Sequence, residues 1–155
     1  MPELIEAELY RAALASAVGR RIEAIEVDPP SYLRYGPSDG DAAASRLIGE
    51  RIIAVRRHGK VVLIDLESAP VLAVRFGMTG RVIVDGAAPI ETLEYGPNTD
   101  DRRWDRVVIH CDGGGTLRFN DARKLGSLEL DADLNRLGPD ATAVSAETLA
   151  AALHT

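Results

Sequence analysis

Four short runs with the patterning of β-strands follow one another between residues 51 and 86, and they constrain the fold of this chain most. They read RIIAVRRHG (51–59), KVVLIDLES (60–68), PVLAVRF (70–76) and GRVIVDG (80–86), with Gly or Pro at most of the breaks. Runs rich in Val, Ile and Leu that are bounded by turn residues are typical of strands. Their succession predicts an antiparallel meander.

Further strands are expected on both sides of this region. The sequence predicts one strand before it, at 20–28, and three after it, at 104–112, 115–121 and 126–130. The stretches 31–40 and 85–103 are expected to form surface loops, because they are polar and hold Gly and Pro. A total of seven or eight strands favours an antiparallel sandwich or a barrel.

Two segments have the spacing of helices instead. Apolar residues three or four positions apart predict an amphipathic helix over 4–18, which Gly19 ends; they are Leu4, Ala7, Tyr10, Leu14 and Val18. The segment DAAASRLIG (41–49) predicts a second helix, with Asp41 as its candidate N-cap. The fold is therefore expected to be mostly β with flanking helices.

Length and composition indicate one globular domain. The chain has 155 residues and is 46% hydrophobic, which is enough for its own core. We expect a cytoplasmic protein, because no apolar run reaches the roughly 18 residues of a membrane span and Glu3 stands where a signal peptide is basic. Cys111 is the only cysteine, so this chain alone offers neither a disulfide nor a cysteine zinc site, and a buried strand position is favoured over a reactive thiol.

The net charge of −6 is unevenly distributed. Residues 51–81 hold six Lys or Arg and two Asp or Glu, a local charge of +4, whereas the segments before and after them are acidic. A basic strip on an acidic body is able to bind an anion at one place. The alternative interpretation is an ordinary solvated strand face.

The start of the chain, MPE, contains a candidate nucleophile. If Met1 is removed, Pro2 presents a secondary amine with a pKa near ~8, so that part of it is neutral and nucleophilic. Attack on a sugar C1′ would give an iminium ion, which is able to expel a base, and Glu3 stands next to it as a proton donor. The alternative is structural, since Pro and Glu both suit the first turn of a helix.

Three further turns carry residues suited to DNA. Lys60 in VRRHGK stands between two strands, and Met78 in RFGMTGR has a glycine on either side of its turn. Arg123, Lys124 and Leu125 in FNDARKLG combine two cations with an apolar residue. Apolar side chains at such tips are used as wedges between base pairs. Each motif taken singly is also compatible with an ordinary turn.

Taken together and in this order, Pro2-Glu3-Leu4 with Glu6 and Glu8, then VRRHGK, FGMTGR and LRFNDARKLG, resemble the formamidopyrimidine-DNA glycosylase and endonuclease VIII family. The similarity runs along essentially the whole chain. It continues through LNRLGPD (134–140), which looks like the entry to that family's helix-two-turn-helix domain.

The resemblance implies a domain organisation. Residues 1–133 are expected to form the N-terminal catalytic domain, a two-layer antiparallel β-sandwich whose first helix carries the nucleophile. Residues 134–155 would begin the helix-two-turn-helix domain, so we expect the chain to be a fragment or a natural truncation. The family's zinc finger would lie beyond it, and we expect no metal or cofactor in this chain.

The resemblance also implies an activity, the removal of oxidised bases by a bifunctional DNA glycosylase and abasic-site lyase in base-excision repair. Pro2 resembles the Schiff-base nucleophile, Glu3 the acid that assists base loss and ring opening, and Lys60 the lysine that contacts the lesion or phosphate. The expected partner is double-stranded DNA with an oxidised base or an abasic site. We expect a monomer that does not associate with membranes.

The same resemblance implies DNA contacts. Met78, Arg123 and Leu125 resemble the three residues that fill the gap left by an extruded nucleotide, with the arginine facing the orphaned base. Lys124 resembles a phosphate contact beside them, and Arg75 stands where a histidine is common.

The chain departs from the family pattern at some of these positions. Ile5 and Ala7 replace a usual Pro and Val, and Leu125 stands where one branch has Phe, so the lesion preference stays open. Two alternatives remain: a non-catalytic or truncated homologue that binds damaged DNA without the C-terminal clamp, and a sandwich domain with an unrelated partner.

Overall fold

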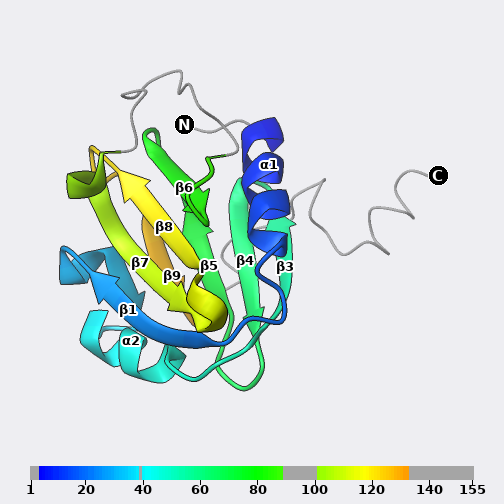
Figure 1. The fold of residues 1–155 in the computed structure, drawn as a ribbon. Helices are drawn as coiled ribbons and strands as arrows, with labels where there is room; N and C mark the ends of the chain where they lie inside the picture. Colours follow the sequence, from blue (N-terminus) through cyan, green and yellow to red (C-terminus); the bar gives the residue numbers. More distant parts are fainter. Residues whose placement is uncertain (1–3, 39, 89–100, 133–155) are drawn as a thin grey trace, which may run out of the picture.

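The computed structural model describes residues 4–38, 40–88 and 101–132 (Figure 1). The helices in this part of the chain are α1 (Leu4–Ala15) and α2 (Gly40–Leu47), with short 3-10 turns η1 (Pro30–Tyr32), η2 (Arg102–Trp104) and η3 (Asp112–Gly114). The strands are β1 (Ile22–Val27), β2 (Leu33–Tyr35), β3 (Ile52–His58), β4 (Val61–Leu66), β5 (Leu72–Arg75), β6 (Gly80–Val84), β7 (Asp105–Cys111), β8 (Thr116–Asp121) and β9 (Ser127–Leu130).

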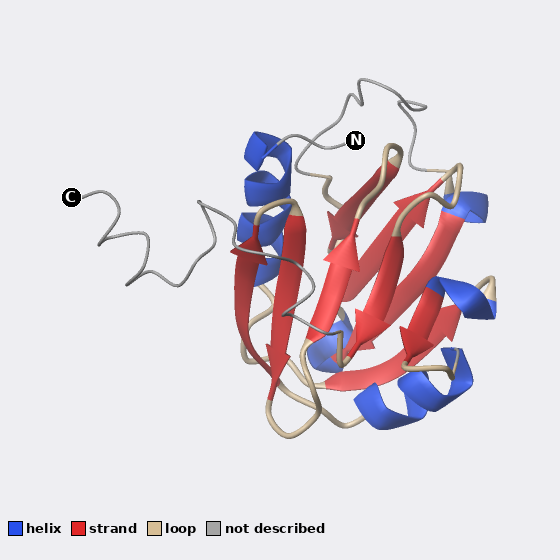
Figure 2. Ribbon diagram, turned by 180° about the vertical axis from the view of Figure 1, so that it is seen from behind, coloured by secondary structure: helices blue, strands red, loops and turns tan. Residues whose placement is uncertain are grey.

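These strands form two sheets that pack face to face, which confirms the predicted two-layer sandwich (Figure 2). One sheet has the order β1-β7-β8-β6 and the other the order β2-β9-β5-β4-β3. The strand pairs are antiparallel, except that β2 runs parallel to β9. Residues that face inward from both sheets build one core, as alternation along each strand requires.

Each helix closes one open side of the sandwich. Helix α1 contacts β6 and β3, the edge strands of the two sheets on one side, and α2 contacts β1 and β2 on the other. The two helices accordingly lie on opposite sides of the molecule in both ribbon views (Figures 1 and 2). Burial of Ala7, Tyr10 and Leu14 confirms the predicted apolar face of α1. The prediction was wrong for Leu4, which is 37% exposed, and for Val18, which lies beyond the end of α1 and is 45% exposed.

Three predictions about the elements were wrong. The meander ends with β5, because β6 crosses to the other sheet and pairs with β8. The stretch 31–40 is not only loop, since it contains most of η1 and the whole of β2, whose three residues pair with β9. Asp41 lies inside the first turn of α2, which begins at Gly40, and is therefore not its N-cap.

Other expectations fall partly outside the described residues. Of the loop predicted over 85–103, the structure describes a turn at 85–88 and the beginning of η2, and residues 89–100 are not described. The predicted second domain segment, 134–155, also lies outside the described residues.

The structure also bears on Cys111 and on the two helices. Cys111 is buried in β7, as predicted, and this burial raises the pKa of its thiol. In the described part of the chain, neither helix has the length and apolar character that a membrane span requires.

Candidate nucleic-acid interface

The site is built where the chain crosses from one sheet to the other. In the described residues the chain makes this crossing three times, at 28–32 between β1 and β2, at 76–79 between β5 and β6, and at 122–126 between β8 and β9. Because β5 pairs with β9 and β6 pairs with β8, the second and third crossings run side by side. The start of β6, the end of β8 and the start of α1 all lie at the upper end of the molecule in Figure 1.

The first of these adjacent crossings, which we call the Met78 turn (residues 76–80), presents an apolar side chain to solvent. Met78 is 40% exposed at this turn, and its proposed role as a wedge stays a prediction. The Gly80 amide donates to the Phe76 carbonyl across the turn at 2.8 Å. The Phe76 ring is buried and lies 4.4 Å, centroid to centroid, from the Tyr10 ring of α1. The start of the Met78 turn is therefore anchored to α1 by the packing of these two aromatic rings.

The second, which we call the Arg123 turn (residues 122–126), presents two cations and an apolar side chain. Arg123, Lys124 and Leu125 are all exposed, Leu125 by 51%. Lys124 adopts a left-handed backbone conformation with φ 56°, and its amide donates to the Asp121 carbonyl at 3.4 Å. All three side chains at the tip of this turn are therefore open to solvent.

The two turns touch each other. A β-carbon placed on Gly77 would lie 2.6 Å from the carbonyl carbon of Leu125, so only a glycine allows this approach. The Arg123 amide donates to the Thr79 hydroxyl at 3.2 Å. Met78, Arg123 and Leu125 therefore belong to one composite surface, as the wedge hypothesis requires of its three residues.

Lys60 occupies the tight turn that was predicted for it, between β3 and β4, and is partly exposed. The ribbon views place this turn toward the same end of the molecule as the start of α1 (Figures 1 and 2). Arg57 joins the two elements: its Nε donates to Glu8 of α1 at 3.0 Å and its Nη1 to the Gly59 carbonyl at 3.0 Å. Hydrogen bonds from Arg11 and then from Arg57 lower the pKa of Glu8, so this link stays charged.

Arg75 is the predicted contact residue whose charge is already engaged. It ends β5, and its Nη1 lies 3.7 Å from a carboxylate oxygen of Glu129 on the neighbouring strand. The preceding Val74 and the following Phe76 are buried in the core. The side chain of Arg75 is thus partly exposed and has Glu129 as an acidic neighbour.

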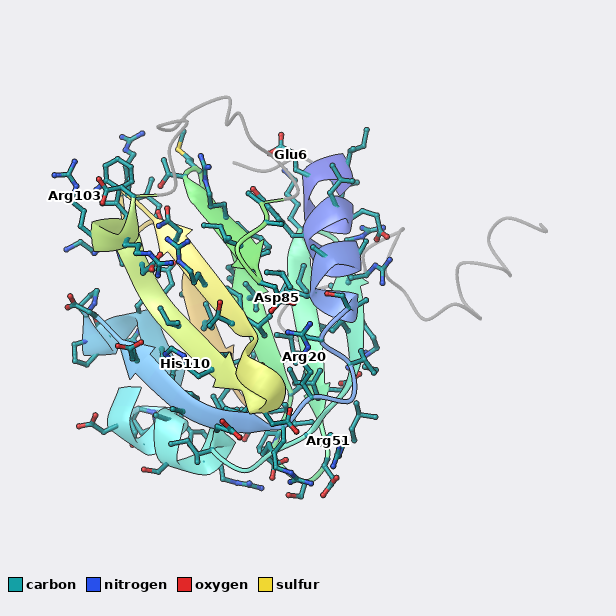
Figure 3. All side chains as sticks on the ribbon, viewed as in Figure 1. Glu6, Arg20, Arg51, Asp85, Arg103 and His110 are labelled. Atoms are coloured by element: carbon teal, nitrogen blue, oxygen red, sulfur yellow. The ribbon has the colours of Figure 1, made fainter. Side chains whose placement is uncertain are left out.

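Pro2 and Glu3 lie outside the described residues, so their roles stay predictions. The first described residue is Leu4, and α1 begins at the end of the molecule that carries the Met78 turn (Figure 1). Glu6, which lies in the first turn of α1, is labelled at that same end in Figure 3.

A buried carboxylate at this site was missed from the sequence. Asp121, the last residue of β8, is fully buried between the two turns. The only sequence signal was an acidic residue at a strand end beside a glycine-bounded turn, which is common in exposed hairpins.

Another part of the surface is hollow, but its lining is not predominantly basic, because the carboxylates of Glu26, Asp28 and Asp105 stand beside Arg102 and Arg118. A hollow of about 470 Å³ lies over β1, β7 and β8, and its lining includes Arg118. Arg118 is paired with Asp105 at 2.9 Å. Among the described residues there is no group of three or more His, Cys, Asp or Glu placed to hold a metal ion. The composite surface of the two turns is therefore the stronger candidate.

The comparison with known proteins agrees with this geometry. A family model of the formamidopyrimidine-DNA glycosylase N-terminal domain matches residues 1–128. The chain belongs to the formamidopyrimidine-DNA glycosylase family. The resemblance inferred from the motifs is thereby confirmed.

Individual relatives support the same assignment. A formamidopyrimidine-DNA glycosylase of Cereibacter sphaeroides is 37% identical over 131 residues, which are 84% of this chain and 44% of the relative. One of Solibacter usitatus is 34% identical over 157 residues, or 99% of this chain and 53% of the relative. The chain thus spans about half the length of these family members.

A solved structure shows the same sandwich. It is a complex of the wild-type Lactococcus lactis Fpg (MutM) with DNA containing N7-benzyl-Fapy-dG, with a TM-score of 0.67 and 25% sequence identity. The match covers 83% of this chain and 43% of that protein. The fold described above is therefore that of the N-terminal part of this family.

Proposed function

We propose that the protein acts in base-excision repair as a DNA glycosylase with abasic-site lyase activity, which removes oxidised bases from double-stranded DNA through Pro2. The observation that carries the proposal is the composite surface. Two exposed apolar side chains, Met78 and Leu125, and the Arg123 cation stand on touching turns, at the end of the molecule where α1 begins. The Lactococcus lactis relative was solved with damaged DNA.

The surface is suited to opening a duplex. Extruding a nucleotide costs a few kcal/mol and least at a damaged pair, so side chains that refill the stack shift the balance toward the extruded state. Met78 and Leu125 supply apolar contact area for that gap, and Arg123 supplies hydrogen-bond donors for the base left behind. Lys124 and Lys60 supply positive charge for the phosphates on an otherwise acidic molecule.

The chemistry follows from the N-terminal amine. The neutral nitrogen of Pro2 attacks C1′ of the damaged nucleotide, the base leaves with a proton, and Glu3 protonates the ring oxygen as the sugar opens to an iminium ion. The iminium withdraws electrons from C2′, so loss of a C2′ proton expels the 3′ phosphate. Hydrolysis of the iminium returns the free amine.

An incision assay on the full-length protein tests the proposal. The substrate is a duplex with a single formamidopyrimidine lesion, and mass spectrometry of the protein records whether Met1 has been removed. We expect strand incision at the lesion, and we expect Pro2→Gly to abolish it while binding to the lesion duplex persists. Lesion binding without incision, in a protein that retains Met1, would instead support the non-catalytic alternative.

A further inference from the structure

The buried carboxylate of Asp121 connects all three sheet crossings that the structure describes. It accepts hydrogen bonds from the Tyr32 hydroxyl at 2.7 Å, from the Gly126 amide at 2.8 Å and from the Thr79 hydroxyl. Tyr32 belongs to the crossing from β1 to β2, Thr79 to the Met78 turn, and Gly126 to the Arg123 turn. One side chain therefore fixes three segments that are distant in sequence.

Thr79 extends this connection to the backbone of the Arg123 turn. Its hydroxyl donates to Asp121 and accepts from the Arg123 amide, so it stands between the carboxylate and the residue proposed to face the orphaned base. Thr79 is 1% exposed and follows directly after Met78. The position of Thr79 therefore fixes the backbone from which the side chains of Met78 and Arg123 extend.

The partners of the Asp121 carboxylate are hydrogen-bond donors. The Gly126 amide is always a donor, and the Tyr32 phenol stays protonated because burial, followed by the charge of Asp121, raises its pKa. Hydrogen bonds to a buried charged acceptor are among the stronger ones in proteins. The main chain is held as well, since Arg106 Nε donates to the Asp121 carbonyl at 2.8 Å.

The close approach also depends on Gly126. A β-carbon at residue 126 would lie 2.8 Å from the Tyr32 hydroxyl oxygen and 2.9 Å from the Phe76 carbonyl carbon. A glycine here allows the Arg123 turn to sit directly on the start of the Met78 turn. The absence of a side chain at Gly126 and the hydrogen bonds to Asp121 therefore both keep the two turns in contact.

We propose that Asp121 and Thr79 are positioning residues, which hold the Met78 turn and the Arg123 turn at the spacing needed for Met78, Arg123 and Leu125 to enter a damaged duplex together. The inference rests on the proposed function, because it assigns these two turns to DNA insertion. Neither residue touches the DNA. Each acts through the exposed side chains that it places.

Two variants separate positioning from plain stability. Thr79→Val removes the hydroxyl that joins Asp121 to the Arg123 turn and keeps the side chain's shape. Tyr32→Phe removes a different hydrogen bond to the same carboxylate, from a residue outside both turns, and is the matched control. Thr79→Ser restores the hydroxyl. Thermal unfolding of each full-length variant measures the loss of stability.

Insertion is measured with 2-aminopurine placed beside the lesion in a duplex, since its fluorescence rises when stacking is disturbed. The wild-type protein gives this signal, and Thr79→Val weakens the insertion equilibrium by about tenfold, as expected for the loss of one charged hydrogen bond. Tyr32→Phe stays within about twofold of wild type at a similar loss of stability, and Thr79→Ser recovers most of the signal. Asp121→Asn loses insertion at least as far as Thr79→Val.

Other outcomes would overturn the inference. Equal weakening by Thr79→Val and Tyr32→Phe, in proportion to their loss of stability, would reduce the cluster to a fold stabiliser. If the wild-type protein gave no rise in 2-aminopurine fluorescence, the proposed insertion of the two turns into DNA would itself be contradicted. Borohydride trapping on single-stranded abasic DNA, which needs no extrusion, reports the chemistry separately: a wild-type protein that inserts but traps nothing contradicts the proposed function and leaves the positioning role standing.

Discussion

Gly77 and Leu125 approach each other so closely that a β-carbon on Gly77 would lie 2.6 Å from the carbonyl carbon of Leu125. Gly77 also has a positive φ of 62°, which disfavours any other residue. The contact joins two turns that are distant in sequence into one exposed surface. Its consequences for stability and for DNA insertion are open to direct measurement.

We expect Gly77→Ala to destabilise the fold by clearly more than the left-handed conformation alone explains. Gly36 is the matched control, because its φ is 59° and a β-carbon there meets nothing within 4 Å. Gly36→Ala should cost about 1 kcal/mol, and Gly77→Ala about 2 kcal/mol more, since two backbone segments must separate. Chemical denaturation measures both. Equal costs would mean that the turns part without strain.

The exposed apolar side chains should matter for DNA and not for folding. We expect Met78→Ala and Leu125→Ala each to change the free energy of unfolding by less than about 0.5 kcal/mol, because both side chains are exposed. The same variants of the full-length protein should excise a damaged base from duplex DNA roughly tenfold more slowly, if each contributes about 1.4 kcal/mol to extrusion. Excision and unfolding are measured on the same preparations.

Ile48 provides the control for that experiment. It is 49% exposed, and it follows α2 at the opposite end of the molecule from the Met78 turn (Figure 1). Ile48→Ala should leave excision unchanged. A comparable loss of excision in this variant would show that the effect of Met78→Ala comes from general loss of apolar surface.

The charge on Lys124 should be visible in the salt dependence of binding. Lys124→Gly removes the cation and suits the left-handed backbone at φ 56°. We expect the slope of log affinity against log salt to become shallower by about one, on damaged and intact duplex alike. Arg51→Gln removes the same charge at the opposite end (Figure 3) and should leave the slope unchanged. Equal slopes for wild type and Lys124→Gly would exclude a phosphate contact.

The stability of the sandwich should depend on Glu50 in acid. Its carboxylate accepts hydrogen bonds from the Ser68 hydroxyl at 2.6 Å and from the Ser68 and Ala69 amides, each at 2.7 Å. The Ser68 bonds, followed by that from Ala69, lower the pKa of Glu50 from 4.5 to about 2. A depressed carboxyl pKa adds stability that is fully present above the unfolded pKa and is lost as the pH falls through the folded one.

We therefore expect Glu50→Gln to be less stable than wild type at neutral pH, by about 1 to 3 kcal/mol. The difference should shrink as the pH falls from about 4.5 to about 2. Glu67→Gln is the control, since Glu67 is 55% exposed and 3.7 Å from Arg51, and it should have little effect. Urea denaturation at a series of pH values measures both, and a gap that stays constant down to pH 2 would contradict the assignment.

The fold was largely predictable because its strongest signals are local. The strands from 51 to 76 and from 104 to 130 have periods and turn residues that do not depend on distant partners. The sheet to which β6 belongs was not predictable, because its own pattern is the same in either sheet. Strand β2 is three residues long and its partner is nearly a hundred residues away, so its local pattern resembles a loop.

The same distinction applies to the site. Met78, Lys60 and Leu125 were predictable as turn residues, because each has a glycine as its direct neighbour in the sequence. Asp121 was not, since its partners Tyr32 and Thr79 stand 89 and 42 residues away along the chain. The sequence could therefore predict the residues at these turns, but it could not predict the buried carboxylate that joins the Met78 turn to the Arg123 turn.

The central claim is that the amine of Pro2 forms the covalent intermediate, and borohydride trapping tests it most directly. The full-length protein is mixed with duplex DNA that holds an abasic site, reduced with borohydride, and digested for mass spectrometry. We predict a stable adduct on an N-terminal peptide that begins at Pro2, and none with Pro2→Gly. An adduct on a lysine such as Lys60, or no adduct from a protein that binds this duplex, would contradict the claim.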